Sequence, residues 1–399
     1  MANVEVKKLF KVIGALVIVS MLLTACATAA PTEAPKVEAP AAEPVAAEPA
    51  AAEPAAAEAA PAEAAPAGAE VPAGVKEGLK IAVVRNLPSD DHTKQFLDGA
   101  RTEGESFGFV VDTFIADNDD AKFQELVAQA IEKGYDGMII SHGKKDYSYD
   151  MLKPAIDKGM KVVTFDTVID KDGQNLPEIT TTAQDDFKLA ELSLNEIIAL
   201  SKDGQPVRVI KLWFGPGTPP LDRRQTIYGP LEEAGKITTL ETVGPSNFQD
   251  VQGDIATKVG ALLAKYPEGT VDAIWGSWDE MAKGAYRALK EAGRTDIKLI
   301  SIDVSNQDMN LMREPDSVWL STAAVDPKLI GIVNMRLLTK KFVGEETPAD
   351  YNLEAKLIKK SDLKEDTTML NLKDVIEGWG KSDAFNEPWM DTLRAKYVK

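Results

Sequence analysis

Polar and aromatic residues stand directly after the apolar runs of this chain, where their side chains could gather at one site. The candidates are Asp90, Asp91, His92, Asp166, Thr167, Arg224, Phe248, Trp278 and Asp303. Carboxylates accept hydrogen bonds from hydroxyl groups, arginine donates a rigid fork of N–H groups, and flat rings cover the apolar C–H faces of a pyranose. Together these residue types match what an uncharged polyol requires of a binding site.

Some of the acidic candidates also have a purely structural interpretation. Asp90, Asp185 and Asp279 could each be the N-cap of a helix, and we favour that interpretation for Asp185 and Asp279. Asp303 could cap the turn that follows it. Asp166 directly ends an apolar run, so capping explains this carboxylate least well.

The larger candidates also have alternative structural roles. Arg224 could be a surface charge, as we expect its neighbour Arg223 to be. Trp278 could pack in the core, but its place between a strand pattern and a helix start favours a pocket wall. We therefore expect Phe248 and Trp278 to sandwich the ring of a bound ligand.

The segments that carry these residues alternate between strand and helix patterns. Buried-strand patterns cover residues 79–84, 109–115, 137–140 and 161–165, and then 207–213, 238–243, 273–276, 298–303 and 317–323. Helical spacing separates them, most clearly where Phe123, Val127 and Ile131 recur at every fourth position. This alternation predicts an α/β fold with two doubly wound parallel-sheet lobes. Ligands of such sheets bind outside the carboxyl ends of the strands, which is where the candidates lie.

The start of the chain carries a different kind of signal. Lysines precede a short apolar run at 12–23, and Leu23-Thr24-Ala25-Cys26 follows it with the only cysteine of the chain. The run is too short for a membrane span of ~20 residues, and its pattern is that of a signal peptide. The tetrapeptide resembles the lipobox of bacterial lipoproteins, whose cysteine is lipidated after cleavage. We expect residues 1–25 to be removed and Cys26 to anchor the protein to the membrane by lipid, at the cell surface or in the periplasm. An ordinary signal peptide or a stray buried thiol is the alternative.

A segment of unusual composition follows the cysteine. From residue 27 to about 72 the chain is almost entirely Ala, Pro and Glu, with a glutamate at every fifth position from Glu33 to Glu63. The prolines prevent a long helix and the like charges repel one another. We expect residues 26–75 to be a disordered tether, with a cell-wall-interacting segment as the alternative.

Composition argues against several other classes of protein. The net charge of −18 is unlike the basic stripe expected for nucleic-acid binding. Two histidines, a single cysteine and no HExxH spacing give no basis for a zinc site or another cofactor. The nucleophile-elbow pattern Gly-x-Ser-x-Gly is absent, and residues 214–218 lack the ending of a phosphate loop, so we interpret them as a rigid turn. We predict no catalytic residues.

Five segments between residues 79 and 363 resemble one family, the ribose-binding-protein-like solute-binding proteins of bacteria. The segments are Phe-Leu-Asp-Gly-Ala at 96–100, Val-Val-Thr-Phe-Asp at 162–166, Val-Asp-Ala-Ile-Trp at 271–275, Asp-Glu-Met-Ala-Lys-Gly-Ala at 279–285 and Leu-Ile-Ser-Ile-Asp at 299–303. The resemblance implies the type I periplasmic binding protein fold, capture of a sugar between two lobes, and delivery to the permease subunits of an ABC importer. It also implies that Asp166, Arg224, Phe248 and Asp303 hold the sugar.

The chain departs from the family at several site positions. Thr167 stands where many relatives have an arginine, Trp278 replaces a common asparagine, and Val325 replaces a glutamine of the hinge. The stretch from Asp90 to His92 stands where relatives carry asparagine and phenylalanine. A monosaccharide or related polyol is therefore the expected ligand, but ribose itself is not supported.

The two lobes divide the chain into interleaved parts. We expect residues 79–182 with 326–357 to form the first lobe, and residues 183–325 with 358–399 to form the second. Three crossings, near 182–183, 325–326 and 357–358, would act as a hinge. We expect a monomer. The alternatives are an exported sensor component for a chemoreceptor or kinase and, less readily, a carbohydrate-active enzyme.

Overall fold

The computed structural model describes residues 68–398. The predicted signal peptide, Cys26 and the predicted tether as far as residue 67 lie outside the described residues. The end of the predicted tether is placed, and it packs on the folded body: Val71 and Val75 lie against the core, and the Oγ1 of Thr392 donates to the carbonyl of Ala69 at 3.1 Å. The tether prediction is therefore wrong for these last residues, because the two valines give this stretch apolar surface to bury.

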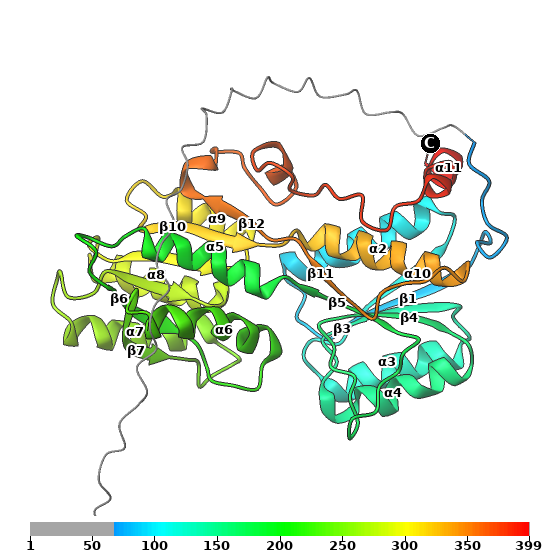
Figure 1. Ribbon diagram of the computed structural model, residues 1–399, viewed down its shortest axis with the longest axis horizontal. Coiled ribbons are helices and arrows are strands. Elements are labelled where there is room, and N and C mark those ends of the chain that lie inside the picture. The colour runs from blue at the N-terminus through cyan, green and yellow to red at the C-terminus, as the bar shows by residue number, and fades with distance from the viewer. Residues whose placement is uncertain (1–67, 399) are drawn as a thin grey trace, which may run out of the picture. The chain divides into compact units, whose positions relative to one another are not determined.

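The first lobe is built on a six-stranded parallel sheet in the order β11-β5-β4-β3-β1-β2. Its elements are β1 (Lys80–Arg85), α2 (Asp91–Ser106), β2 (Val110–Ile115), α3 (Asp120–Glu132), β3 (Gly137–Ser141), α4 (Lys145–Asp157), β4 (Lys161–Phe165), β5 (Thr180–Gln184), α10 (Pro327–Phe342) and β11 (Asp350–Leu353). Helices α2 and α10 cover one face of this sheet, and α3 and α4 cover the other (Figure 1).

The second lobe is built on a six-stranded sheet in the order β12-β10-β9-β8-β6-β7, parallel except for β12. Its elements are α5 (Asp186–Ile198), β6 (Val207–Leu212), α6 (Pro219–Glu233), β7 (Ile237–Val243), α7 (Val251–Lys265), β8 (Ala273–Gly276), α8 (Asp279–Glu291), β9 (Lys298–Ile302), α9 (Asn306–Arg313), β10 (Trp319–Ala324) and β12 (Lys356–Lys359). The predicted α/β class with two mostly parallel sheets is confirmed.

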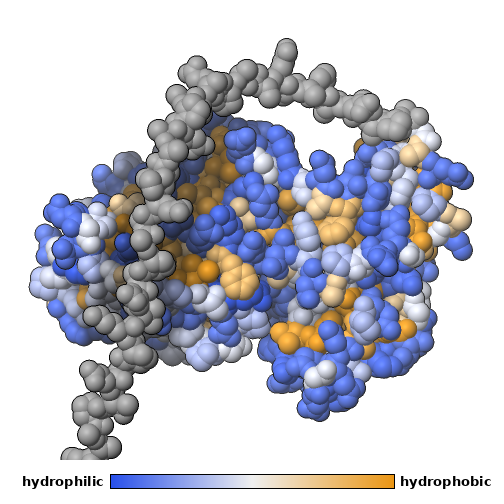
Figure 2. Space-filling model, in the orientation of Figure 1, coloured by the Kyte–Doolittle hydropathy of each residue, from blue (hydrophilic) through white to orange (hydrophobic). Residues whose placement is uncertain are grey.

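Helices cover these sheets because their apolar residues recur with helical spacing. In α3, Phe123, Val127 and Ile131 turn toward the sheet and are buried, while the outward face of α3 and α4 is largely hydrophilic (Figure 2). On the other face α2 and α10 approach each other closely. A Cβ atom at Gly99 would lie 2.0 Å from the carbonyl oxygen of Lys328, so this crossing requires glycine.

The C-terminal strap, which we define as residues 363–397, contacts both lobes (Figure 1). Its first part, including η2 (Leu372–Asp374), buries Leu372 and Trp379 against the second lobe. Its last helix, α11 (Pro388–Tyr397), instead buries Trp389 and Leu393 in the core cluster that contains Phe107 of α2. Placing all of residues 358–399 in the second lobe is therefore wrong for α11, whose apolar face is covered by the first lobe.

In residues 68–398, no helix has both the length and the apolar character needed to cross a bilayer. The chain passes between the two sheets from β5 to α5, from β10 to α10 and from β11 to β12, and the strap adds a further passage. These passages bring the ends of strands from both lobes together.

Candidate functional site

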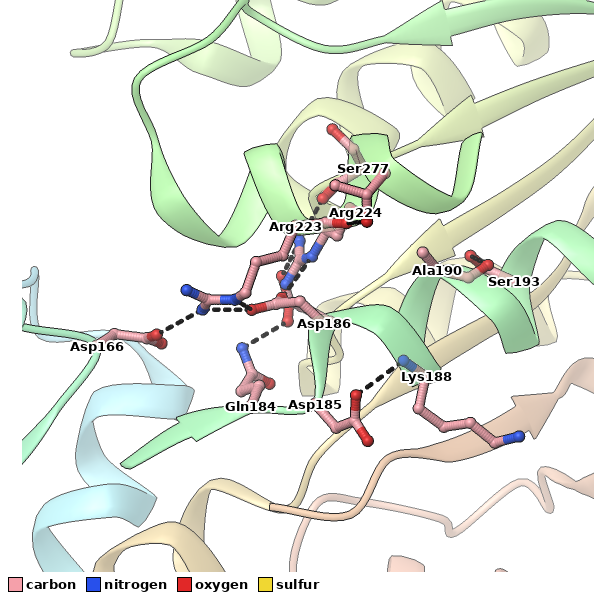
Figure 3. A network of polar contacts seen from close by, with 12 residues as sticks. Asp166, Gln184, Asp185, Asp186, Lys188, Ala190, Ser193, Arg223, Arg224 and Ser277 are labelled. Atoms are coloured by element: carbon pink, nitrogen blue, oxygen red, sulfur yellow. Dashed lines mark hydrogen bonds and ion pairs between the residues drawn. The ribbon is translucent and has the colours of Figure 1, made fainter. Parts of the chain in front are cut away.

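A buried carboxylate, Asp186, lies at the centre of the polar network between the lobes (Figure 3). Asp185 caps α5 by accepting from the backbone N–H of Lys188 at 2.9 Å, as the sequence predicted. Asp186 is the next residue, in the first helical turn, where the helix dipole favours a negative charge. Asp186 is not among the residues predicted from the sequence. Its signal was a pair of acidic residues that opens a helix directly after a strand.

Two neighbouring arginines of α6 share the two oxygens of Asp186. The Nε of Arg224 donates to Oδ1 at 2.7 Å. The Nε and one terminal nitrogen of Arg223 donate to Oδ2 at 3.0 and 2.6 Å. Arg224 is buried, and it also donates to the carbonyl of Ser277. The expectation that Arg223 is a surface charge is wrong, because its guanidinium turns toward Asp186 and is only 27% exposed.

The network extends to the ends of two strands, one in each lobe. Asp166 follows β4 of the first lobe and accepts from Arg223 at 3.1 Å. Asp303 follows β9 of the second lobe and lies 3.4 Å from a terminal nitrogen of Arg224. The amide of Gln184, at the end of β5, donates to Asp303 at 3.3 Å. The structure thus brings Asp166, Arg224 and Asp303 together, although they are far apart in the sequence.

The backbones of both aspartates lie in the left-handed region. The φ angle is 42° at Asp166 and 74° at Asp303. Aspartate tolerates this region better than most residues, but the conformation is uncommon and such strain gathers at functional sites. The turn at each position directs the chain sharply away from its strand at the sheet edge that faces the other lobe.

Burial changes the proton affinity of the same two carboxyl groups. Burial, followed by the nearby charge of Asp186, raises the pKa of Asp166 to about 7. Burial likewise raises the pKa of Asp303 to about 6, although the Arg224 guanidinium opposes the shift. Each group can therefore accept a hydrogen bond when ionised or donate one when protonated, near neutral pH.

Three aromatic rings of the second lobe form one cluster. Phe214 packs edge to face against Phe248, with the ring centroids 5.4 Å apart, and against Trp278, with the centroids 6.4 Å apart. Phe248 is 58% exposed. Phe214 therefore lies against both residues of the predicted sandwich, although the sequence analysis assigned it only to a rigid turn. An aromatic residue directly after the strand pattern at 207–213 was the signal that could have identified it.

The first-lobe candidates have different partners. Asp90 is exposed and caps α2 through the backbone N–H of Thr93 at 2.7 Å, which is the structural role considered for it. Asp91 accepts from the amide of Asn306, in the second lobe, at 2.8 Å. Asn306 in turn accepts from the backbone N–H of Met369 in the C-terminal strap at 2.9 Å. The strap thus contacts the residue that joins Asp91 to the second lobe.

Two further candidates are engaged by the protein itself. The buried hydroxyl of Thr167 accepts from the backbone N–H of Gly143 at 3.1 Å and donates to the carbonyl of Phe165 at 3.1 Å. The favoured N-cap role of Asp279 is wrong, because Trp278 occupies the N-cap position of α8. Asp279 instead pairs with the buried Lys283 at 3.0 Å. A lysine four positions along the same helix was the available signal.

His92 contacts a residue that the sequence analysis missed. Arg85 ends β1 and is fully buried, and one of its terminal nitrogens lies 2.7 Å from the Nδ1 of His92. Burial and the adjacent guanidinium lower the pKa of His92 to about 3. A charged residue directly after the apolar run at 81–84 was the available signal. Among residues 68–398, no group of three or more His, Cys, Asp and Glu side chains is arranged to hold a metal ion.

The chain is similar in sequence to known proteins. The model of the periplasmic binding protein domain matches residues 81–346. The ribose import binding protein RbsB of Escherichia coli is 26% identical over 292 residues, which cover 73% of this chain and 94% of that protein.

Two solved structures are similar over a larger share of the chain. A sugar ABC transporter structure from Yersinia enterocolitica has 48% identity and a TM-score of 0.73, and the match covers 82% of this chain and 99% of that one. A 5-methylthioribose transporter solute binding protein from Thermotoga lettingae, in complex with 5-methylthioribose, has 26% identity and a TM-score of 0.71. That match covers 82% of this chain and all of the other.

Proposed function

Since the chain belongs to the periplasmic binding protein family, we propose that it binds a monosaccharide or related polyol between its two lobes and delivers it to an ABC importer. The fold is the type I fold that the sequence predicted. The relatives named for ribose import and for 5-methylthioribose transport support a sugar-like ligand. The permease subunits of the importer are the proposed protein partners, and the protein itself is proposed to be a monomer.

The observation that carries this proposal is the network to which both lobes contribute. Asp166 of the first lobe meets Arg223 of the second, and Asp303 of the second lobe meets Gln184 of the first. A ligand bound here would contact both lobes. Carboxylates and guanidinium groups provide acceptors and donors for hydroxyl groups, and the cluster around Phe214 provides apolar surface for C–H groups.

A panel of neutral sugars and polyols tests this proposal with the chain that begins at residue 27. The panel includes 5-methylthioribose, ribose and ribitol, and we expect at least one of its members to raise the melting temperature without being converted to a product. A ligand at 100 times its Kd adds about 2.7 kcal/mol to the free energy of unfolding. Formation of a product would instead favour a carbohydrate-active enzyme.

A pair of arginine variants tests the site itself. Arg223→Gln removes the contact with Asp166, and we expect it to weaken binding at least tenfold, which is ~1.4 kcal/mol. Arg208→Gln is the matched control, because Arg208 of β6 pairs with Asp272, the residue before β8, outside the network. Equal affinities of the two variants for the same sugar would sink the site assignment.

We further propose that the lobes move about the passages at residue 185, at 325–326 and at 354–355. The first and last differ from the crossings expected near 182–183 and 357–358, because β5 continues to Gln184 in the first sheet and β12 begins at Lys356 in the second. A ligand that contacts both lobes favours the closed state through its higher affinity for it. X-ray scattering from residues 68–399 should give a smaller radius of gyration with a saturating ligand. An unchanged radius with a ligand of proven affinity argues for a preformed site.

Lipid anchoring at Cys26 is a separate proposal, and it rests on the lipobox-like sequence. We expect the full chain to be found outside the cytoplasm and in the membrane fraction. Cys26→Ser should release the protein or leave it unprocessed. Normal maturation and anchoring of that variant would contradict the proposal.

A further inference from the structure

Arg85, at the end of β1, is a buried cation whose hydrogen-bond partners are neutral groups. Its Nε donates to the Oγ1 of Thr93 at 2.9 Å, and its terminal nitrogens lie 3.0 Å from the Oγ of Ser141 and 2.7 Å from the Nδ1 of His92. The guanidinium also lies over the Phe96 ring, 4.7 Å from its centroid. Within residues 68–398 it forms no ion pair within 4 Å. Burying a charge without an ion-pair partner costs free energy, which suggests that Arg85 has a role other than stabilising the fold.

The first consequence concerns the proton of His92. A guanidinium has only N–H donors and no acceptor. The Nδ1 of His92 must therefore accept from Arg85, and the ring is neutral with its proton on Nε2. A positively charged imidazole would have N–H groups at both nitrogens and would point one of them at the arginine.

The second consequence passes through a serine to the other histidine of the chain. The Oγ of Ser141 accepts from Arg85 and lies 2.7 Å from the Nδ1 of His142. Among residues 68–398 the Ser141 hydroxyl has no other hydrogen-bond partner. Ser141 therefore donates its one proton to the Nδ1 of His142, which places the proton of that ring on Nε2 as well. Burial and the Arg85 charge lower the pKa of His142 well below its usual value.

Both rings lie beside the candidate site. Arg85 and Ser141 are register partners on the adjacent strands β1 and β3, and His142 follows β3 directly. The His142 ring packs edge to face on Phe165, with the centroids 5.5 Å apart, and Phe165 precedes Asp166. Both histidines are partly exposed, and among the described residues neither Nε2 has a hydrogen-bond partner.

We infer that Arg85 is a positioning residue that fixes His92 and His142 as neutral Nε2–H donors, and that these donors select a ligand with uncharged acceptor oxygens. The claim about the ligand rests on the proposed function and narrows the proposed class of ligand. Hydroxyl, ring or carbonyl oxygens can accept from the two N–H groups. An ammonium group placed at the two N–H groups offers no acceptor and is repelled by the buried Arg85 charge, so an amino sugar is disfavoured there. The Asp166 and Asp303 carboxyl groups do not offset this, because they already face Arg223 and Arg224.

Nitrogen NMR of the chain from residue 27, labelled at histidine, tests the positioning role without any ligand. The chain has two histidines, so two sets of ring signals are expected. Each should show an unprotonated Nδ1 and a protonated Nε2. Arg85→Met should move both rings to averaged positions between the tautomers. Thr93→Val, which removes a different acceptor of Arg85, should leave both tautomers in place.

The outcomes separate this role from a merely structural one. A protonated Nδ1 in the unmodified chain, or a fixed Nε2–H tautomer in a folded Arg85→Met protein, overturns the inference about Arg85. If Arg85→Met does not fold, the tautomers of the unmodified chain and of Thr93→Val still decide, because each is predicted to hold Nε2–H at both rings.

The ligand part is tested with matched neutral and amino sugars, glucose with glucosamine and galactose with galactosamine, added to the sugar panel. We expect any binding among them to favour the neutral member at least tenfold, and a bound neutral sugar to shift the Nε2–H signals. An amino sugar that binds as well as its neutral partner overturns the selectivity. If no panel sugar binds, the proposed function and the ligand class both fail, whereas the tautomer result for Arg85 stands.

Discussion

Arg224 and Asp186 form an ion pair in which the arginine Nε lies 2.7 Å from a carboxylate oxygen, and neither side chain is more than 3% exposed. A pair buried to this extent is held in one geometry by its surroundings, here by α5 and α6. Arg223 and Asp303 attach to it from either side. The pair therefore sets the position of the groups that face the other lobe.

Loss of Asp186 is expected to destabilise the protein strongly. Asp186→Asn leaves the buried Arg224 charge with the neutral Ser277 carbonyl and the longer contact to Asp303. Removal of one partner of a buried pair typically costs ~3–5 kcal/mol. Urea denaturation followed by circular dichroism measures the loss. Asp185→Asn is the matched control, because asparagine also caps helices and this variant should unfold within ~0.5 kcal/mol of the unmodified chain. Equal stability of the two variants would show that the pair is not structural.

The Asp166 carboxyl is expected to make the protein less stable as the pH rises. Its pKa is about 7 in the folded protein, above the ~3.9 of an unfolded chain. Between these values the folded state holds a proton that the unfolded state has released. Its contribution to stability is therefore complete below pH ~3.9 and is lost as the pH rises through about 7.

The asparagine of Asp166→Asn cannot titrate. The stability of this variant relative to the unmodified chain should therefore rise as the pH is raised from 5 to 8. Urea denaturation of both proteins at pH 5 and pH 8 measures how their difference in unfolding free energy changes with pH. Any part of the Arg223 effect that does not depend on pH cancels in this comparison. An unchanged stability difference at the two pH values would show that the Arg223 charge dominates and keeps the pKa of Asp166 at or below its ordinary value.

The aromatic cluster is expected to act as a unit. Phe214→Ala removes the ring that contacts both Phe248 and Trp278, so we expect affinity for a bound sugar to fall and its effect on tryptophan fluorescence to shrink. Each aromatic contact is worth ~0.5–1.5 kcal/mol beyond the area it buries. Phe187→Ala, which truncates another exposed phenylalanine, should bind normally. If calorimetry shows that Phe214→Ala binds the sugar with unchanged affinity, Phe214 is not part of the site.

The terminal helix is expected to stabilise the first lobe. Leu393 is 5% exposed, and Leu393→Ala should cost ~2–5 kcal/mol, the range for a buried leucine. Hydrogen exchange should show faster opening of α2, against which α11 packs. Val398→Ala, at a position that is 61% exposed, should change neither quantity. Faster exchange only in the second lobe would contradict this placement of the strap.

Local patterns in the sequence determined the class of fold and several of the site residues. Alternating strand and helix patterns fix which elements form, because apolar spacing records the face that each element must bury. The position of Asp166 and Asp303 at strand ends was likewise visible, since the carboxyl ends of parallel strands share one edge of the sheet. The cap at Asp185 depends on neighbouring residues alone.

The tertiary structure decided which charges meet. Asp186 and Arg223 look like ordinary helix residues in the sequence, and only the packing of α6 beside α5 makes them partners. The contacts of Arg85 likewise depend on packing, because its partners lie on α2 and β3, eight and 56 positions away in the sequence. Placement of α11 on the first lobe depends on which apolar surface remains uncovered once both sheets have formed. Such pairings are set by long-range packing, which leaves no periodic signal in the sequence.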